Sequence, residues 1–444
     1  MKKLLGIVVI VIAAVCLISP KIIADQYQKQ LESFVAYLNK SAGYQAKVES
    51  MNNSWFGSKA NISVVLDPSK IDPNSAIGPI KANIVLDTHY GPLLFNKQSL
   101  IGLYSTQASI PADKARDTLV WDNNRPLYQL NITRGLTGNL TMADAIPSFT
   151  DKAKTLSFSG YSGSGENKNN TFHYQGALKD ISASGQQSAS LKDLSIELAM
   201  DTSADLNNGG LRDSDMTLKV GDIQVASKLA IKDLSIATHS NLDKKTQLGN
   251  IKISYTADSF SLPSVQATNL SFVTELKNLN NSVLTTIYKE LNNTPNNTDL
   301  TNQQIMEVLQ GNLKPFLASK PELNITDFSG TLPEGSFKSS LTSKLTDIKD
   351  PQIEDLFTPQ FWKYEAIVKT DMLVDEPLAN SWAQQFVARQ AHVPVQLPQV
   401  KQQAQMILAG FIQQGLIKKE KDQYRTDITM KDGQISVNDI PLPM

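Results

Sequence analysis

The chain of 444 residues contains a single cysteine, Cys16, which lies inside an apolar segment near the N-terminus. The rest of the chain has no cysteine, so intrachain disulfides are excluded and the fold must be held by core packing. Histidine is also scarce. His89, His173, His239 and His392 are scattered without a second ligand-type residue at metal-site spacing, so no catalytic zinc site is expected.

Blocks of like charge are absent as well. The chain has 42 Lys and Arg residues against 43 Asp and Glu residues, which predicts no nucleic-acid partner and no attraction to an anionic membrane surface. The glycine-rich segment 160–165 lacks the spacing of a nucleophile elbow, dinucleotide fingerprint or P-loop, and we interpret it as a hairpin loop. Asp144, Asp193 and Glu197 could form an acid/base pair only if the fold brought them together. We therefore expect no enzymatic activity, no cofactor and no metal.

What the chain does have is an apolar run at residues 4–18, preceded by Lys2 and Lys3. Basic residues before such a run are typical of an export signal, so the remaining chain is expected to cross a membrane and fold outside the cytosol. A run of about fifteen residues has the length of a cleaved signal and is shorter than the ~20 residues that usually span a bilayer.

A retained anchor is nevertheless favoured over a cleaved signal. No small-x-small cleavage site follows the run directly, and Pro20 and Lys21 suit a signal peptidase poorly. Residues 22–24 prolong the apolar character, and Tyr27 would lie at the membrane interface. We therefore predict a signal-anchor or transmembrane segment at residues 1–25. Its predicted anchor residues are Leu4, Leu5, Ile7, Val8, Val9, Ile10, Val11, Ile12, Val15, Leu17 and Ile18.

Lipidation of Cys16 is the other alternative for this segment. It is disfavoured because Val15, directly before the cysteine, is bulky where a small residue is required. Too little apolar sequence also precedes Cys16 for a lipoprotein signal.

Residues 26–272 are predicted to form a helix, at about residues 26–40, followed by an elongated antiparallel β region. Apolar and polar residues alternate there, which indicates strands with one apolar face. Short turns containing Gly, Pro, Asn or Asp separate the strands, so neighbouring strands are expected to be antiparallel, as in a meander. The alternating segments are 60–66, 80–86, 128–132, 194–200, 216–220 and 251–255.

A weak internal repeat, apolar-Lys-Asp-apolar-Ser, occurs at residues 178–182, 191–195 and 231–235. Its unequal spacing argues against a solenoid. We interpret the repeat as a polar turn reused where strands begin, or as similar hairpins in one elongated sheet.

The C-terminal part is predicted to contain two pairs of amphipathic helices, at residues 273–320 and 376–418, separated by a β region at 321–375. Strand alternation in that region is expected to begin at Trp362, and a hairpin through Asp432 and Gly433 closes the chain within 419–444. The predicted fold class is α+β, predominantly antiparallel β. It combines an N-terminal membrane helix, a long one-face-apolar meander and two helical pairs packed on the meander.

Three segments resemble the YdgA-like family of Gram-negative bacteria: residues 43–58, residues 320–335 and residues 415–438. The family usually has Arg-Gly-Trp-Phe-Ser in the first segment, whereas this chain has Asn53 and Ser54 before Trp55 and Phe56. The resemblance implies a periplasmic protein held at the inner membrane by a single N-terminal pass. It implies no catalytic residues, because the family has no established activity.

Trp55 and Phe56 are the candidate ligand or partner contacts. Adjacent residues of a strand point to opposite faces, so one ring is expected in the core and the other covered or exposed. If the four helices leave part of the apolar sheet uncovered, the protein would bind a lipid or acyl chain in envelope maintenance, an architecture similar in style to AsmA-like envelope proteins. If they cover it, an envelope scaffold or protein-interaction module is expected. The sequence does not indicate an oligomeric state.

Overall fold

The computed structural model describes residues 2–442 except 72–74, 76–77, 95–99, 186–187, 204–208 and 294–301, and it describes the backbone alone at residues 2–18, 292–293 and 302. The chain divides into two compact units. Unit 1 comprises Met1–Gln186, Lys192–Asp205 and Leu291–Thr301. Unit 2 comprises Gln187–Leu191, Leu206–Glu290 and Asn302–Met444.

Unit 1 begins with one long helix, α1 (Lys2–Lys40), which joins the predicted anchor and the predicted following helix and contains Pro20. Gly43, with a φ of +81°, follows the helix and allows the chain to turn into the first strand. The predicted anchor residues between Leu4 and Ile18 lie in α1, and their side chains are outside the described part. Within the residues that the structure describes, no helix combines the length and the apolar character that crossing a bilayer requires.

The sheet of unit 1 is antiparallel, and its neighbouring strands follow in the order β1, β2, β3, β4, β6, β7, β10 and β11. A smaller group of strands, β5, β8 and β9, extends from β11. The short helices η1 (Pro68–Lys70) and η2 (Asp113–Asp117) lie in connections, and residues 192–201 of β12 (Ala189–Asp201) also belong to this unit. The strand bounds are β1 Tyr44–Asn53, β2 Gly57–Leu66, β3 Ile80–Tyr90, β4 Tyr104–Ile110, β5 Leu119–Val120, β6 Tyr128–Arg134, β7 Leu140–Ile146, β8 Phe149–Asp151, β9 Leu156–Phe158, β10 Tyr161–Lys168 and β11 Thr171–Ala183.

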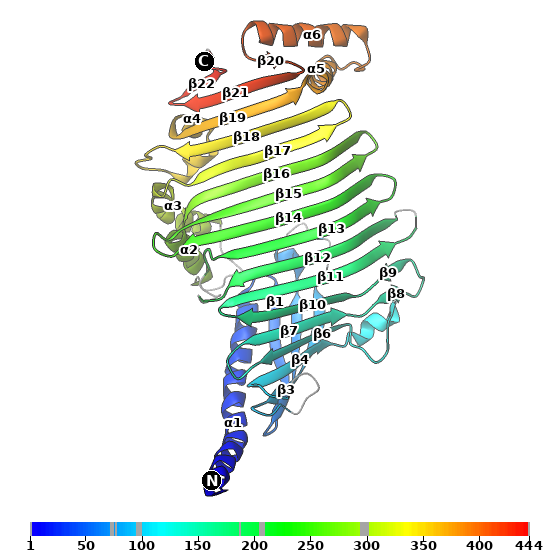
Figure 1. The fold of residues 1–444 in the computed structure, drawn as a ribbon, viewed down its shortest axis with the longest axis vertical. Helices are drawn as coiled ribbons and strands as arrows, with labels where there is room; N and C mark the ends of the chain where they lie inside the picture. The colour runs from blue at the N-terminus through cyan, green and yellow to red at the C-terminus, as the bar shows by residue number, and fades with distance from the viewer. Residues whose placement is uncertain are drawn as a thin grey trace. The chain divides into compact units, whose positions relative to one another are not determined.

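The second half of α1 contributes side chains to two hydrophobic clusters of unit 1. Figure 1 shows this helix beside the first strands of the unit. Leu31 packs against Ala60 and Ile62, two residues of the alternating segment that the sequence analysis placed on the apolar face of a strand. Ile23 and Tyr27 pack with Tyr90, which is fully buried. The expectation that Tyr27 lies at a membrane interface is therefore wrong, because its ring is buried among protein side chains and its hydroxyl accepts a hydrogen bond from Thr88.

Unit 2 is built on a meander of strands β13 to β19, continued by β21, β22 and β23, in which each strand pairs antiparallel with the next (Figure 1). The short strand β20 (Lys418–Glu420) pairs with β21. The bounds are β13 Ser214–Val225, β14 Leu229–Asp243, β15 Leu248–Leu262, β16 Val265–Asn280, β17 Glu322–Leu332, β18 Gly335–Leu345, β19 Ala366–Asp375, β21 Gln423–Lys431, β22 Gln434–Val437 and β23 Ile440–Pro441. Predominantly antiparallel β structure is thus confirmed, and so is the C-terminal hairpin, in which Asp432 and Gly433 both take a positive φ.

The helices of unit 2 are α2 (Asn281–Asn293), α3 (Asn302–Ala318), η4 (Ile353–Phe357), α4 (Pro359–Glu365), α5 (Glu376–Ala391) and α6 (Pro398–Gln413). The first helical pair does not begin at residue 273, since β16 continues to Asn280 and Leu276 pairs with Leu323 of β17. The predicted cap at Thr301 lies outside the described residues. Trp362 lies in helix α4 and not in a strand. Pro359 favours this helix because its ring fixes φ near the helical value in the first turn.

Two further predictions of local structure are wrong. The glycine-rich segment is not a loop, because Tyr161 begins β10, which pairs on both sides with β7 and β11. The repeated Lys-Asp pairs do not mark strand starts: Asp193 and Asp233 lie inside β12 and β14 with φ values of 53° and 51°. A left-handed aspartate inside a strand locally interrupts its regular geometry, and Asp233 is skipped in the pairing with β13.

Candidate functional site

Five aromatic side chains form a continuous row on the sheet of unit 2, which we call the aromatic row: Tyr255, Phe272, Phe328, Phe337 and Trp382. Tyr255 of β15 stands opposite Phe272 of β16, and Phe272 stands opposite Phe328 of β17. The successive ring centroids are 6.3, 5.8, 5.1 and 5.8 Å apart, within the range of direct aromatic contact. Residues opposite one another in an antiparallel pair project to the same face, so the rings share one face of the sheet.

Apolar residues extend this row over further strands. Ile236 of β14 stands opposite Tyr255, and Leu218 of β13 stands opposite Ile236. At the other end, Trp382 lies on α5, and Phe386 follows it one turn later on the same side of the helix. An uninterrupted apolar path therefore runs from β13 to α5.

Helix α5 lies at one end of this path, and α6 packs on α5 through Val400 and Ala404 (Figure 1). Helix α3 packs through Leu313 and Leu317 on η4 and on the last residue of β18. In the middle of the path, Tyr255, Phe272 and Phe328 remain 42%, 36% and 46% exposed. Rings of this size are ordinarily buried, so a connected exposed set indicates a contact surface.

Tyr255 lies in the alternating segment 251–255, which predicts an apolar strand face, but nothing in the sequence predicts the aromatic row. Phe272 is far from Phe328 in the sequence, and strand alternation alone does not say which residues of neighbouring strands stand opposite one another. No local signal marks the row.

Trp55 and Phe56, the contacts selected from the sequence, are not part of the aromatic row. They lie in the turn that joins β1 to β2 in unit 1, where Ser54 donates its backbone N–H to the Gly57 carbonyl. The two side chains are 54% and 42% exposed, so neither ring enters the core. The expected division between two faces of a strand does not apply, since the residues are not in a strand.

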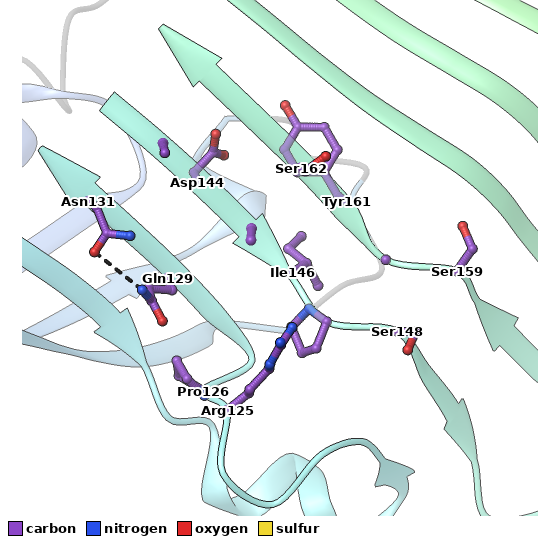
Figure 2. Close-up of a pocket in the computed structure, with 14 residues that line it drawn as sticks. Arg125, Pro126, Gln129, Asn131, Asp144, Ile146, Ser148, Ser159, Tyr161 and Ser162 are labelled. Carbon is purple, nitrogen blue, oxygen red and sulfur yellow. Dashed lines mark hydrogen bonds between the residues drawn. The ribbon is translucent and has the colours of Figure 1, made fainter. Parts of the chain in front are cut away.

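Unit 1 contains a second candidate site, a pocket of about 640 Å³ on β6, β7 and β10 (Figure 2). Its floor is Ala143 and Ala145 of β7, which stand opposite Asn131 and Gln129 of β6 on one side. Ser162 of β10 stands opposite Ala145 on the other side. The alanines are short beside the longer amides of β6, and the serine opposite Ala145 on β10 is short as well, which leaves the hollow. Gln129 donates a hydrogen bond of 3.3 Å to Asn131, the dashed line in Figure 2.

Arg125 reaches this pocket from a connecting segment that Arg116 holds in place. The Arg116 guanidinium lies 3.9 Å from the centre of the Trp121 ring, a cation–π contact, and donates a 3.0 Å hydrogen bond to the Arg125 carbonyl. The indole N–H of Trp121 donates to the same carbonyl at 2.9 Å. The backbone of Arg125 is thus fixed, while its side chain remains largely exposed beside Asp122 at 3.7 Å.

A cluster of tyrosines surrounds Asp144, the acidic residue among those that line the pocket. Tyr174 donates to Asp144 Oδ1 at 3.0 Å, Tyr128 donates to Oδ2 at 3.3 Å, and the Tyr161 and Tyr174 hydroxyls are hydrogen-bonded to each other. Burial, followed by the nearby Asp144 charge, raises the pKa of Tyr128 to about 12. Burial and the hydroxyl of Tyr161 also raise the pKa of Tyr174. These tyrosines therefore act as hydrogen-bond donors to the carboxylate.

The structure does not make Asp144 part of an acid/base pair. Because strand residues alternate between faces, its side chain lies on the face opposite Ala143 and Ala145 and is occupied by tyrosine hydroxyls. Glu197 lines an adjoining depression of about 370 Å³ in unit 1, which shares Ser162 with the pocket, and Asp193 lies in β12 with a φ of 53°. Among the described residues, no three His, Cys, Asp or Glu side chains are grouped so as to hold a metal ion.

The family model described as "Bacterial protein of unknown function (DUF945)" matches residues 1–444, the whole chain. The protein belongs to this family. No curated protein and no solved structure matches the chain of this DUF945 member. The family description names no activity.

Proposed function

We propose that this DUF945 protein binds an acyl chain along the aromatic row, without catalysing a reaction. The observation that carries the proposal is the connected, exposed set of Tyr255, Phe272 and Phe328 on one face of the sheet of unit 2. A ligand that covers these rings removes apolar surface from water, which contributes about 25 cal/mol of binding free energy for each Å² buried.

The dimensions of the aromatic row fit an acyl chain. The row crosses β15 to β18, and strands lie ~4.8 Å apart, so its width is roughly 15 Å. This is about half of the ~30 Å hydrocarbon core of a bilayer, the depth filled by one leaflet of acyl chains. The apolar path through Ile236 and Leu218 lengthens the surface on the same face.

The chemistry of the row favours a hydrocarbon over a polar ligand. Four of its five side chains are Phe or Trp, and the residues that extend it over β13 and β14 are aliphatic. The row offers no carboxylate or basic group for acid/base chemistry, which supports binding without catalysis. A protein segment is the alternative occupant, as expected of an envelope scaffold.

Attachment to the bacterial inner membrane, with the bulk of the chain in the periplasm, is part of the proposal. It is supported by the apolar run after Lys2 and Lys3 and by the YdgA-like resemblance. Ile23 and Tyr27 pack in the core of unit 1, so the membrane-embedded part would be confined to residues 4–18. Those residues would extend roughly 22 Å as a helix, and the two lysines at their start could reach the headgroups.

Trp382 at the end of the row provides a reporter for the test. The full chain, purified in a mild detergent, is titrated with a 16-carbon fatty acid brominated near its middle, and tryptophan quenching is recorded. We expect saturable quenching that is largely lost in Trp382→Phe and at least tenfold weaker in affinity in Phe272→Ser/Phe328→Ser. Phe357→Ser is the matched control, because Phe357 is 73% exposed on η4, outside the row.

Lipid mass spectrometry of the same preparation distinguishes a bound acyl chain from a bound protein segment. Stoichiometric phospholipid, reduced in the Phe272→Ser/Phe328→Ser variant, supports acyl-chain binding. Lipid-free protein with a reproducible protein partner, or quenching unchanged in the double variant, would overturn it.

A further inference from the structure

The pocket over β6, β7 and β10 in unit 1 has a chemistry different from that of the aromatic row. Its floor is two alanine methyl groups, its walls carry the amides of Gln129 and Asn131 and the hydroxyl of Ser162, and Arg125 lies at its edge (Figure 2). Its volume of about 640 Å³ is typical of small-molecule sites.

The charge on the pocket side comes from Arg125. Asp144 also lines the pocket, but its carboxylate lies on the opposite face of β7, where Tyr128 and Tyr174 donate to it. The ion pair of Arg125 with Asp122, at 3.7 Å between two exposed groups, is weak and leaves the guanidinium available to a ligand. A guanidinium held only by this weak, exposed ion pair favours a ligand that carries an oxyanion.

The walls favour a ligand with several hydroxyl groups. Amide and hydroxyl side chains both donate and accept hydrogen bonds, and a sugar hydroxyl does the same. The hydrogen bond between Gln129 and Asn131 holds the two amides in a fixed relation along β6. The methyl groups of Ala143 and Ala145 provide a flat apolar floor, suited to the C–H face of a pyranose ring.

The segment that presents Arg125 is rigid, which distinguishes it from an ordinary exposed arginine. Two donors, Arg116 and Trp121, hold the carbonyl of Arg125, and Trp121 is 6% exposed under the Arg116 guanidinium. These contacts hold the Arg125 backbone before a ligand arrives, which lowers the ordering cost of binding.

From these observations we propose that this pocket binds a pyranose that carries one oxyanion, either a carboxylate or a phosphate. Arg125 pairs with the oxyanion, while Gln129, Asn131 and Ser162 bond the hydroxyls. The site is independent of acyl-chain binding by unit 2.

Titration calorimetry on the full chain tests the proposal with four probes: glucuronate, glucose 1-phosphate, glucose and inorganic phosphate. We expect one or both of the charged sugars to bind at least tenfold more tightly than glucose and than phosphate alone, with affinity that falls as salt is raised. A preference between glucuronate and glucose 1-phosphate identifies the oxyanion. Equal binding of glucose would overturn the role of the charge, and equal binding of phosphate would overturn the role of the sugar.

Variants then assign the binding to this pocket. Arg125→Gln, a change at an exposed side chain, is expected to weaken binding about tenfold, and Ala145→Phe, which fills the floor, to abolish it. Arg389→Gln is the matched control, since Arg389 is an exposed arginine in the last turn of α5. Circular dichroism verifies folding, and Arg125→Gln decides the outcome if Ala145→Phe is misfolded. Unchanged affinity in Arg125→Gln, or no binding of either charged sugar at millimolar concentration, would overturn the proposal.

Discussion

Phe272 of β16 meets Phe328 of β17 edge to face, with the ring centroids 5.8 Å apart and the ring planes at 87°. The two residues stand opposite one another in the register of the strands, and each also contacts a further ring, Tyr255 or Phe337. The pair therefore stabilises the sheet locally while it leaves aromatic surface in contact with water. These ring contacts hold the side chains of the aromatic row in place before any ligand binds.

Phe328→Ser is expected to lower the free energy of unfolding by about 1 kcal/mol, because it removes two aromatic contacts worth ~0.5–1.5 kcal/mol each at a partly exposed position. Urea denaturation measures the change. Phe357→Ser should stay within about 0.5 kcal/mol of wild type, as for surface substitutions in general. Equal losses in the two variants would show that the aromatic contacts of the row contribute nothing to stability.

Gly163→Ala is expected to destabilise unit 1 by about 2 kcal/mol, as overpacking does. A Cβ at residue 163 would meet the hydroxyl of Tyr174 and the carboxylate of Asp144. Thermal unfolding measures the loss, and in a Tyr174→Leu background the same change should cost less than half as much. Gly78→Ala is the control, because a Cβ at residue 78 meets no atom within 4 Å. A loss that persists unchanged in the Tyr174→Leu background would contradict the steric cause.

The pKa of Tyr128, raised from 10.0 to about 12 by burial and the Asp144 charge, predicts a loss of stability at alkaline pH. The folded protein keeps Tyr128 protonated, whereas the unfolded chain loses that proton near pH 10. Its contribution is therefore complete below pH 10 and disappears as the pH rises towards 12. Stability of wild type and Tyr128→Phe, measured between pH 9 and 12, should converge as the pH rises. Parallel curves would contradict the assigned pKa.

The hydrogen bonds to the Asp375 carboxylate lead us to expect a loss of stability at acid pH. Gln423 donates to its Oδ1 at 2.8 Å and the backbone N–H of Ser336 donates to its Oδ2 at 2.7 Å, and these bonds lower the pKa of the carboxyl below 3.8. A lowered pKa in the folded state gives stability that is present above pH 3.8 and is lost as the pH falls through the folded-state pKa.

Asp375→Asn should lower the free energy of unfolding by about 1 kcal/mol at neutral pH, a modest loss because solvent screens this partly exposed, hydrogen-bonded charge. The variant should also lose less stability than wild type as the pH falls. Urea unfolding at pH 2 to 7 gives the comparison. An acid limb as steep as that of wild type would show that another carboxylate dominates it.

Membrane attachment predicts that the protein stays in the pellet when bacterial membranes are washed at alkaline pH. Protease added to spheroplasts should degrade it, since the bulk of the chain is expected in the periplasm. Replacing Val8 and Val11 with Asp should release the protein, because a charge at the middle of an apolar helix costs about 3 kcal/mol in a bilayer. A shortened soluble form of the wild type would instead show that the segment is a cleaved signal.

Local patterns predicted much of the fold. The alternation through Ala60 and Ile62 identified the buried face of β2, and Asp432 with Gly433 identified the last hairpin, because both features depend on neighbouring residues alone. Predictions failed where distant partners decided the outcome. The apolar spacing of Leu276 and Leu279 suggests a helix, yet both lie in β16. Both pair with β15, and Leu276 also pairs with β17.

The sequence by itself determined a mostly antiparallel β protein with N-terminal helical structure, short turns and helices between the later strands. These features follow from the spacing of apolar residues, from helix-capping residues and from turn residues, all of which act within a few positions of the chain. Only the tertiary structure decided where its surfaces lie. The aromatic row depends on the register of four neighbouring strands, β15 to β18. The pocket depends on the register of three strands, β6, β7 and β10, which sets the short alanines opposite the longer amides of β6. Register is set by the packing of whole strands, so no single segment encodes either site.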